Sequence, residues 1–282
     1  MTQIPGTTLL SILANVAGGG GGSLLSTLYG SGTSGAGVST DPLTALRLAT
    51  KNRSREVAAT AKESQTLRDV TDFRKGVAKA GTIAQALDDP RVLKVLLTAN
   101  GLADQLPYAA LAKKVLLSDP ADPKSLVNRL ADSRWSAVVS AFQFATKGID
   151  TLRDTAVQTT LADGYAEVAW RRGLEAKTPG LSDALDIRAR AKTFTSALQV
   201  LGDPVARRVI TTALGIPKEI AFQELPTQEK AITTRLDLKR LQDPKFVDGL
   251  SQRYLLERQK SASPTDQPSL SFLAVQARSL FV

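Results

Sequence analysis

The side chains that most often carry catalysis or bind transition metals are missing from this sequence. The chain of 282 residues contains no histidine and no cysteine. Their absence removes thiol nucleophiles, histidine-based catalytic triads, imidazole bases and the usual zinc ligands. Carboxylate or serine–lysine chemistry is compatible with the composition, but no spacing of such residues points to it. We therefore predict no catalytic, cofactor-binding or metal-ligating residues, no cofactor, and a protein that is not an enzyme.

One motif of phosphate-binding type does occur, early in the sequence. Gly30, Gly32 and Gly35 have the G-x-G-x-x-G spacing of a dinucleotide-binding loop. Such a loop needs a buried strand before it and a capped helix directly after it. Neither pattern is found, and the surrounding residues are rich in glycine and serine. The motif therefore indicates a linker.

Basic residues outnumber acidic residues by 36 to 27, which gives a formal net charge of +9. An excess of this size can indicate binding to nucleic acid. The basic residues, among them Arg171, Arg190 and Arg208, are nevertheless spread along the chain and alternate with acidic residues. Aromatic residues that could stack on bases are few. Solvated helix faces are the favoured interpretation, and a surface for nucleic acid or an acidic partner is the alternative.

The elements that position these side chains are predicted to be helices, and one helix occurs twice. Residues 89–102 and 203–216 each begin with Asp-Pro and end with a glycine followed by an apolar residue. Aspartate caps a helix, proline suits its first turn, and glycine adopts the left-handed conformation that ends it. Both copies carry the same apolar stripe, which predicts one buried face. The stripe consists of Val92, Val95, Leu96 and Ala99 in one copy and of Ala206, Val209, Ile210 and Ala213 in the other.

The repetition extends over about 60 residues, 82–142 and 196–255, and no stretch shows the alternation of a strand. Helix breaks are expected near Gly76 and Gly81, a long helical stretch over 150–177, and a further helical stretch over 182–201. We predict an all-α fold built on a duplicated multi-helix module. Its parts are a flexible Gly/Ser-rich segment (1–40), a first helical module (41–149), a second helical module (150–258), and a linker with a short apolar C-terminal helix (259–282).

The two ends of the sequence differ from its middle. No charged residue precedes Asp41, and short apolar patches interrupt the glycine-rich stretch. Residues 270–282 are strongly apolar, with Leu270, Phe272, Leu273, Val275, Leu280, Phe281 and Val282. We expect these ends either to contact other molecules or to fold back onto the helical body. No apolar run reaches the roughly 18–20 residues of a membrane span, and Met1-Thr2-Gln3 gives no indication of a cleaved secretory signal.

The stretch 194–204, followed by 212–217 and 241–244, resembles an alphaproteobacterial family defined as a domain of unknown function. The resemblance spans roughly residues 70–255. Members are typically encoded among flagellar genes, often carry two copies of the domain, and are sometimes labelled flagellar basal-body rod proteins. The family has no established catalytic residues to carry over. The resemblance implies a non-enzymatic flagellar structural or assembly protein, whose partners are flagellar proteins or further copies of itself.

Two alternatives accompany this interpretation. The first is a cytoplasmic flagellar export chaperone or regulator, and the second is a basic nucleic-acid-binding protein. An exported component would be located in the basal body or an axial structure, whereas a helper would stay in the cytoplasm. Axial flagellar proteins usually begin with an Ala-Asn-rich helix that contains threonine, and residues 1–40 lack that signature.

Overall fold

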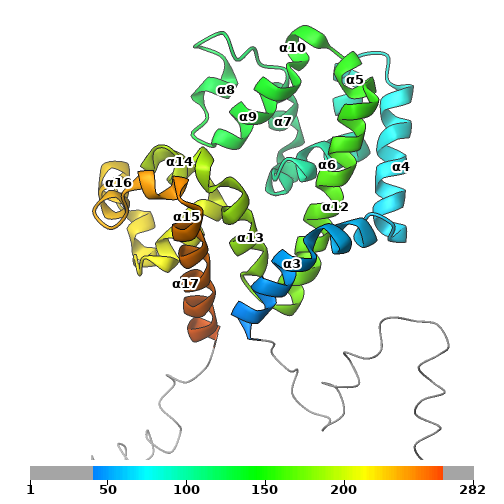
Figure 1. Ribbon diagram of the computed structural model, residues 1–282. Helices are drawn as coiled ribbons and strands as arrows, with labels where there is room; N and C mark the ends of the chain where they lie inside the picture. The colour runs from blue at the N-terminus through cyan, green and yellow to red at the C-terminus, as the bar shows by residue number, and fades with distance from the viewer. Residues whose placement is uncertain (1–40, 263–282) are drawn as a thin grey trace, which may run out of the picture. The chain divides into compact units, whose positions relative to one another are not determined.

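The computed structural model describes residues 41–262, and every regular element in this range is a helix. The predicted all-α fold is therefore confirmed for the described residues (Figure 1). The predicted flexible segment (1–40), its Gly30–Gly35 motif and the apolar stretch 270–282 lie outside the described residues. No helix among residues 41–262 is long and apolar enough to cross a membrane.

The helices follow one another with short connections. The first part of the chain forms α3 (Pro42–Thr60), α4 (Ser64–Lys79), α5 (Ile83–Asp88), α6 (Pro90–Ala99), the 3-10 helix η1 (Ala103–Tyr108), α7 (Ala109–Leu116), α8 (Leu126–Arg129), α9 (Ser133–Phe142), α10 (Phe144–Lys147) and α11 (Asp150–Arg153). The second part forms α12 (Thr155–Lys177), α13 (Leu181–Arg190), η2 (Ala191–Thr193), α14 (Ala197–Gly202), α15 (Pro204–Ala213), η3 (Lys218–Phe222), α16 (Leu225–Thr233), η4 (Leu238–Gln242) and α17 (Pro244–Ala262).

The repeated helix forms as predicted at both positions, as α6 and α15. The side chain of Asp89 accepts a hydrogen bond from the backbone of Arg91, and Asp203 caps α15 in the same way. Gly101 and Gly215 have φ angles of 73° and 62°, which confirms the predicted left-handed ends. At each end the residue after the glycine donates its N–H to a carbonyl five residues earlier, and this bond is part of a Schellman cap. The predicted stripes are buried in both copies, except that Ala99 is half-buried.

Two helix triplets surround two apolar cores. In the first core cluster α4, α6 and α12 pack together around fully buried side chains such as Phe73 and Leu96. In the second core cluster α13, α15 and α17 pack around Ile187 and Ile210. The apolar stripes of α6 and α15 therefore occupy corresponding places, each covered by two further helices.

The helix boundaries differ from the sequence expectation at three places. α4 runs through Gly76 without a break, because this buried glycine faces Val92 of α6 at a distance that leaves no room for a side chain. The chain bends earlier, between Thr60 and Ser64. The stretch 150–177 is interrupted at Asp154, which caps α12, and the stretch 182–201 is interrupted by η2 and by the cap Ser196 of α14. In the last two cases a polar side chain binds the backbone and starts a new helix.

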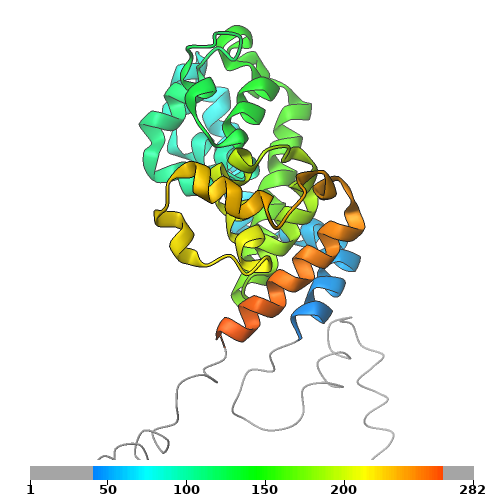
Figure 2. The same cartoon turned by 90° about the vertical axis from the view of Figure 1, so that its left-hand side faces the viewer.

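Side-chain packing runs across the sequence position proposed as the module boundary. Leu161 of α12 belongs to the first core cluster and Trp170 of the same helix to the second. α3, at the start of the predicted first module, contributes Leu46 and Ala49 to the second core cluster. It lies beside α17, as Figure 2 shows. The boundary at 149/150 thus stays a prediction about the sequence repeat. In the structure α12 contributes to both core clusters, and α3 packs in the second.

Candidate functional site

Charged side chains from different helices are paired in two matching triads and in a more deeply buried network of arginine and aspartate. Each triad joins the three helices of one core. In the first, Asp69 of α4 accepts hydrogen bonds from Lys94 of α6 (2.8 Å) and from the hydroxyl of Tyr165 of α12 (2.6 Å). Gly164 lets α12 approach α6 at this place, because a Cβ there would lie 3.1 Å from the carbonyl oxygen of Ala99.

The second triad repeats the first with related residues. Asp183 of α13 accepts from Arg208 of α15 through two nitrogens, at 2.6 and 2.8 Å. It also accepts from the hydroxyl of Tyr254 of α17 at 2.7 Å. Both the aspartate and the cation lie 114 residues beyond their counterparts, at the offset of the repeated helix.

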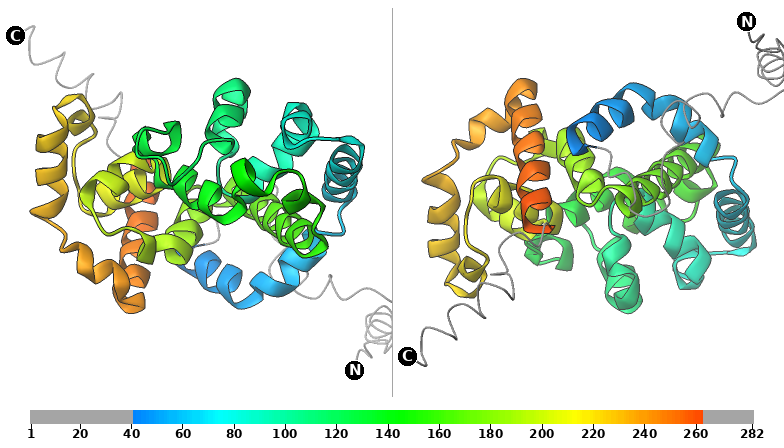
Figure 3. Two further views of the ribbon diagram at one scale, coloured as in Figure 1. Left: turned by 90° about the horizontal axis from the view of Figure 1, so that it is seen from above. Right: turned by 90° about the horizontal axis from the view of Figure 1, so that it is seen from below.

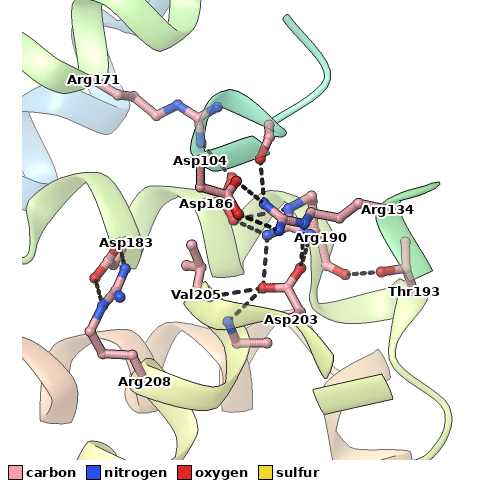
Figure 4. Close-up of polar contacts among 12 residues, drawn as sticks. Asp104, Arg134, Arg171, Asp183, Asp186, Arg190, Thr193, Asp203, Val205 and Arg208 are labelled. Carbon is pink, nitrogen blue, oxygen red and sulfur yellow. Dashed lines mark hydrogen bonds and ion pairs between the residues drawn. The ribbon is translucent and has the colours of Figure 1, made fainter. Parts of the chain in front are cut away.

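Asp203 is the centre of the arginine–aspartate network, which Figure 4 shows. Its side chain is completely buried. One carboxylate oxygen accepts the backbone N–H groups of Val205 and Ala206, both at 2.9 Å, and so caps α15. The other oxygen, Oδ2, lies 2.7 Å from Nη1 of Arg190 in α13 and 3.9 Å from Nε of Arg134 in α9. Asp203 thus caps a helix and also lies beside two guanidinium groups.

Each of the two arginines continues to further carboxylates. Arg190 binds Asp186 one helical turn earlier, and Asp186 also accepts from Arg171 of α12 at 2.7 Å. Arg134 lies 2.7 Å from Asp132 and 2.9 Å from Asp104 of η1. Arg134 also donates to the carbonyl oxygen of Gly101, at the left-handed end of α6. The network therefore links the end of one repeated helix to the start of the other.

Close backbone packing accompanies this link. A Cβ at Gly202 would lie 2.4 Å from the carbonyl oxygen of Ala131 and 2.8 Å from its carbonyl carbon. Only glycine fits there, because backbone cannot move aside as a flexible side chain could. The residues before α9 and the residues before α15 thus form a tight contact between the two core clusters.

The charges of the network shift the pKa values of its members. Burial raises the pKa of Asp186, but the hydrogen bonds and charges of Arg190 and Arg171 outweigh burial and hold it below its usual value. Burial also raises the pKa of Asp69, but the hydrogen bonds from Lys94 and Tyr165 outweigh it, so the pKa of Asp69 is lowered as well. For Arg190, burial lowers the pKa, and Asp203 and Asp186 more than compensate, so its pKa is raised.

These shifts define what the arrangement does chemically. A carboxylate with a lowered pKa is a weak base, and an arginine with a raised pKa stays protonated. The network therefore holds fixed opposite charges together and joins helices that are far apart in sequence. No group of three or more acidic side chains among residues 41–262 is placed to hold a metal ion.

Sequence reasoning missed the ion pairs of the triads and of the network. It assigned Arg171, Arg190 and Arg208 to solvated helix faces, whereas the side chain of Arg171 is largely buried and all three bind aspartates. A signal was present in the repeat itself, because Asp69 and Asp183 stand at the same offset as Lys94 and Arg208. The i, i+4 spacing of Asp186 and Arg190 was a second signal.

Comparison with known proteins identifies the family of this chain. A family model described as a protein of unknown function, DUF1217, matches residues 99–247, more than half of the chain. The chain belongs to this family. Within the matched range lie Arg134, Arg190 and Asp203, so the centre of the network lies in the part that defines DUF1217. No curated protein matches the sequence.

A solved structure shares the fold. The crystal structure of an Agrobacterium tumefaciens protein, determined as a structural-genomics target, aligns with a TM-score of 0.67 over 82% of this chain and 100% of that chain. The aligned sequences are 22% identical. At this identity the likeness concerns the fold alone.

Proposed function

We propose that this protein is a non-enzymatic component of the bacterial flagellar system, structural or assembly-related, that acts through contacts with other proteins. The flagellar part of the proposal rests on the sequence resemblance described above. The part that concerns protein contacts is supported by one structural observation, a pair of exposed apolar side chains that occurs once in each half of the structure.

The first pair is Tyr108 and Leu111, at the end of η1 and in α7. The second is Phe222 and Leu225, at the end of η3 and the start of α16. Tyr108 is 61% exposed and Phe222 is 89% exposed. Each aromatic residue lies 114 positions from its counterpart, and so does each leucine.

The exposure of these pairs is not a consequence of a poorly packed segment. Leu106 and Ile220, two residues before the aromatic residues, pack against the first and second core clusters respectively. In each half, the segment thus packs one apolar side chain against the core and leaves the following aromatic residue and leucine exposed to solvent. A single exposed apolar residue is ordinary on a protein surface. An aromatic–leucine pair exposed at equivalent positions of two repeats supports a role in binding. Figure 3 shows α16 at the periphery of the described helices.

A motility assay tests the proposal. Replacing Tyr108→Ser and Phe222→Ser together in the chromosomal gene should reduce swimming and the number of flagella per cell, because partner contacts are lost. Leu48→Ser with Leu67→Ser is the matched control, since these leucines are about half exposed but stand outside the repeated pairs. The control should swim normally. Circular dichroism of the purified variants verifies their folding. Normal flagella and swimming in a strain that lacks the gene would overturn the proposal.

Cell fractionation separates the structural from the cytoplasmic interpretation. Presence in purified hook–basal bodies or in the culture medium supports an exported component. Confinement to the cytoplasm, with binding to flagellin or another export substrate, supports a chaperone or regulator. A DNA affinity that falls steeply with rising salt concentration would instead support the nucleic-acid-binding alternative.

A further inference from the structure

A groove opens between the second half of α3 and the second half of α12. Its volume is about 500 Å³. Ala59 of α3 and Ala169, Gly173 and Leu174 of α12 line it, and Trp170 lies at its side. Two acidic and two basic residues also line the groove, so its formal charge is balanced. A segment with little net charge would therefore meet no excess of either sign there.

The helix face at the groove has space for another element. A Cβ on Gly173 would have no atom within 4 Å, which shows that nothing among the described residues packs on α12 at this turn. The indole nitrogen of Trp170 donates to Glu56 across the groove at 3.3 Å. An amphipathic helix commonly binds a protein by laying its apolar face into a groove.

The sequence contains a segment suited to this groove. Residues 270–282 hold one charged side chain, Arg278, and have apolar or small residues at 270, 273, 274 and 277. This i, i+3, i+4, i+7 spacing would place them on one face of a helix. We propose that residues 270–282 bind in the groove between α3 and α12 of the same chain. The proposal does not depend on the proposed function.

The position at which α17 ends supports this assignment. Arg258 of α17 packs beside the turn after α12, because a Cβ on Gly180 would lie 3.5 Å from Cγ of Arg258. Lys177, at one end of the groove, precedes Gly180 by three residues. α17 continues only one turn beyond Arg258, to Ala262. The seven residues 263–269 can span roughly 23 Å, and they follow a helix that ends one turn after its contact with the turn beside the groove.

Engineered cysteines provide a direct test, because the natural chain contains none. The full-length variant Gly173→Cys with Leu273→Cys places one thiol in the groove and one in the segment. A disulfide forms only when the two Cα atoms come within about 7 Å. If the segment binds in the groove, oxidation should yield an intramolecular disulfide at least about tenfold faster than a random encounter between tethered thiols.

The matched control is Gly249→Cys with Leu273→Cys. Gly249 is also a helical glycine with open space around it, but it lies on α17. A second groove variant, Ala59→Cys with Leu273→Cys, should match the fast rate even if Gly173→Cys perturbs α12. Circular dichroism verifies the helix content of all three variants, and non-reducing gels separate monomers from dimers.

Three results would overturn the proposal. Equal oxidation rates for the groove and control variants would show that the segment has no preference for the groove. A disulfide-linked dimer as the main product would assign the groove to a second copy of the chain. Faster oxidation of Gly173→Cys with Leu10→Cys would assign it to the apolar residues near the start of the sequence.

Discussion

Asp69 and Asp183 stand 114 residues apart and make the same set of contacts in two different cores. Each carboxylate accepts a tyrosine hydroxyl and binds a cation from the repeated helix, Lys94 in one case and Arg208 in the other. The two tyrosines, however, are only 89 residues apart, in α12 and α17. The helices that supply the tyrosines, α12 and α17, are therefore not related by the offset of the repeat. Each nevertheless donates a tyrosine hydroxyl to the aspartate of its triad.

The tyrosine hydroxyls should contribute measurably to stability. Tyr165→Phe and Tyr254→Phe each remove one hydrogen bond to a charged carboxylate and leave the ring in place. We expect a loss of about 1.5–3 kcal/mol in the free energy of unfolding for each variant, measured by urea denaturation. Tyr108→Phe is the control, because Tyr108 is exposed and should change little. A loss in Tyr108→Phe as large as in the other two would contradict the role of the triads.

The two equivalent helix caps should differ in importance. Asp89→Ala removes a partly exposed cap and should cost about 1 kcal/mol. Asp203→Ala removes a cap and also the completely buried carboxylate that binds Arg190 and lies near Arg134. Each arginine keeps another aspartate, Asp186 or Asp132, so the cost should lie near the lower end of the range for a broken buried ion pair, roughly 3 kcal/mol. Thermal and urea unfolding of both variants measure the difference. Equal losses would mean that the network around Asp203 adds nothing to its cap.

Close packing at Gly202 gives a third prediction. Gly202→Ala should destabilise the protein by about 1–3 kcal/mol or more, because its Cβ would overlap the Ala131 carbonyl group. Gly249→Ala makes the same chemical change in an open part of α17 and should stabilise the protein by roughly 0.5–1 kcal/mol. Opposite signs in urea denaturation confirm the contact, and a stable Gly202→Ala variant would refute it.

The left-handed glycines should behave alike. Gly101 and Gly215 have open space around them, so substitution meets no steric contact and costs only backbone strain. Gly101→Ala and Gly215→Ala should each lower the free energy of unfolding by about 1 kcal/mol. Gly101→Asn should lose less, because asparagine tolerates this conformation better than alanine does. Thermal melts of the three variants test this order.

Acid should lower the free energy of unfolding, because it protonates carboxylates that are paired in the folded protein. The folded-state pKa values of Asp69 and Asp186 lie below their ordinary values, mainly because Lys94 and Arg190 outweigh the effect of burial. Such groups contribute stability that is present above the unfolded-state pKa and is lost as the pH falls through the folded-state pKa. The free energy of unfolding should therefore be steady near neutral pH and fall below about pH 4.

The variant Asp69→Asn tests how much Asp69 contributes to the loss of stability in acid. Asp69→Asn keeps the size of the side chain but cannot titrate. The slope of unfolding free energy against pH, measured by urea denaturation at several pH values, should be shallower below about pH 4 in this variant than in the natural protein. An unchanged slope would show that Asp69 contributes nothing to acid sensitivity.

The sequence by itself determined the features that depend on neighbouring residues. The caps Asp89 and Asp203, the left-handed Gly101 and Gly215 and the apolar stripes between them follow from local hydrogen bonding and helical periodicity, and all are present. Local rules also produced the errors. A glycine usually weakens a helix, but Gly76 lies inside α4 because close packing against α6 requires it.

Only the tertiary structure decided which charges meet. Asp69 and Tyr165 are 96 residues apart, and Arg134 reaches Asp203 from a helix in the other half of the chain. No local spacing records such pairs, since each depends on how α12 and α9 pack on distant helices. The burial that makes these charges bind one another is likewise a property of the packed cores. The repeated helices were therefore readable from the sequence, and the long-range contacts of the network that joins them were not.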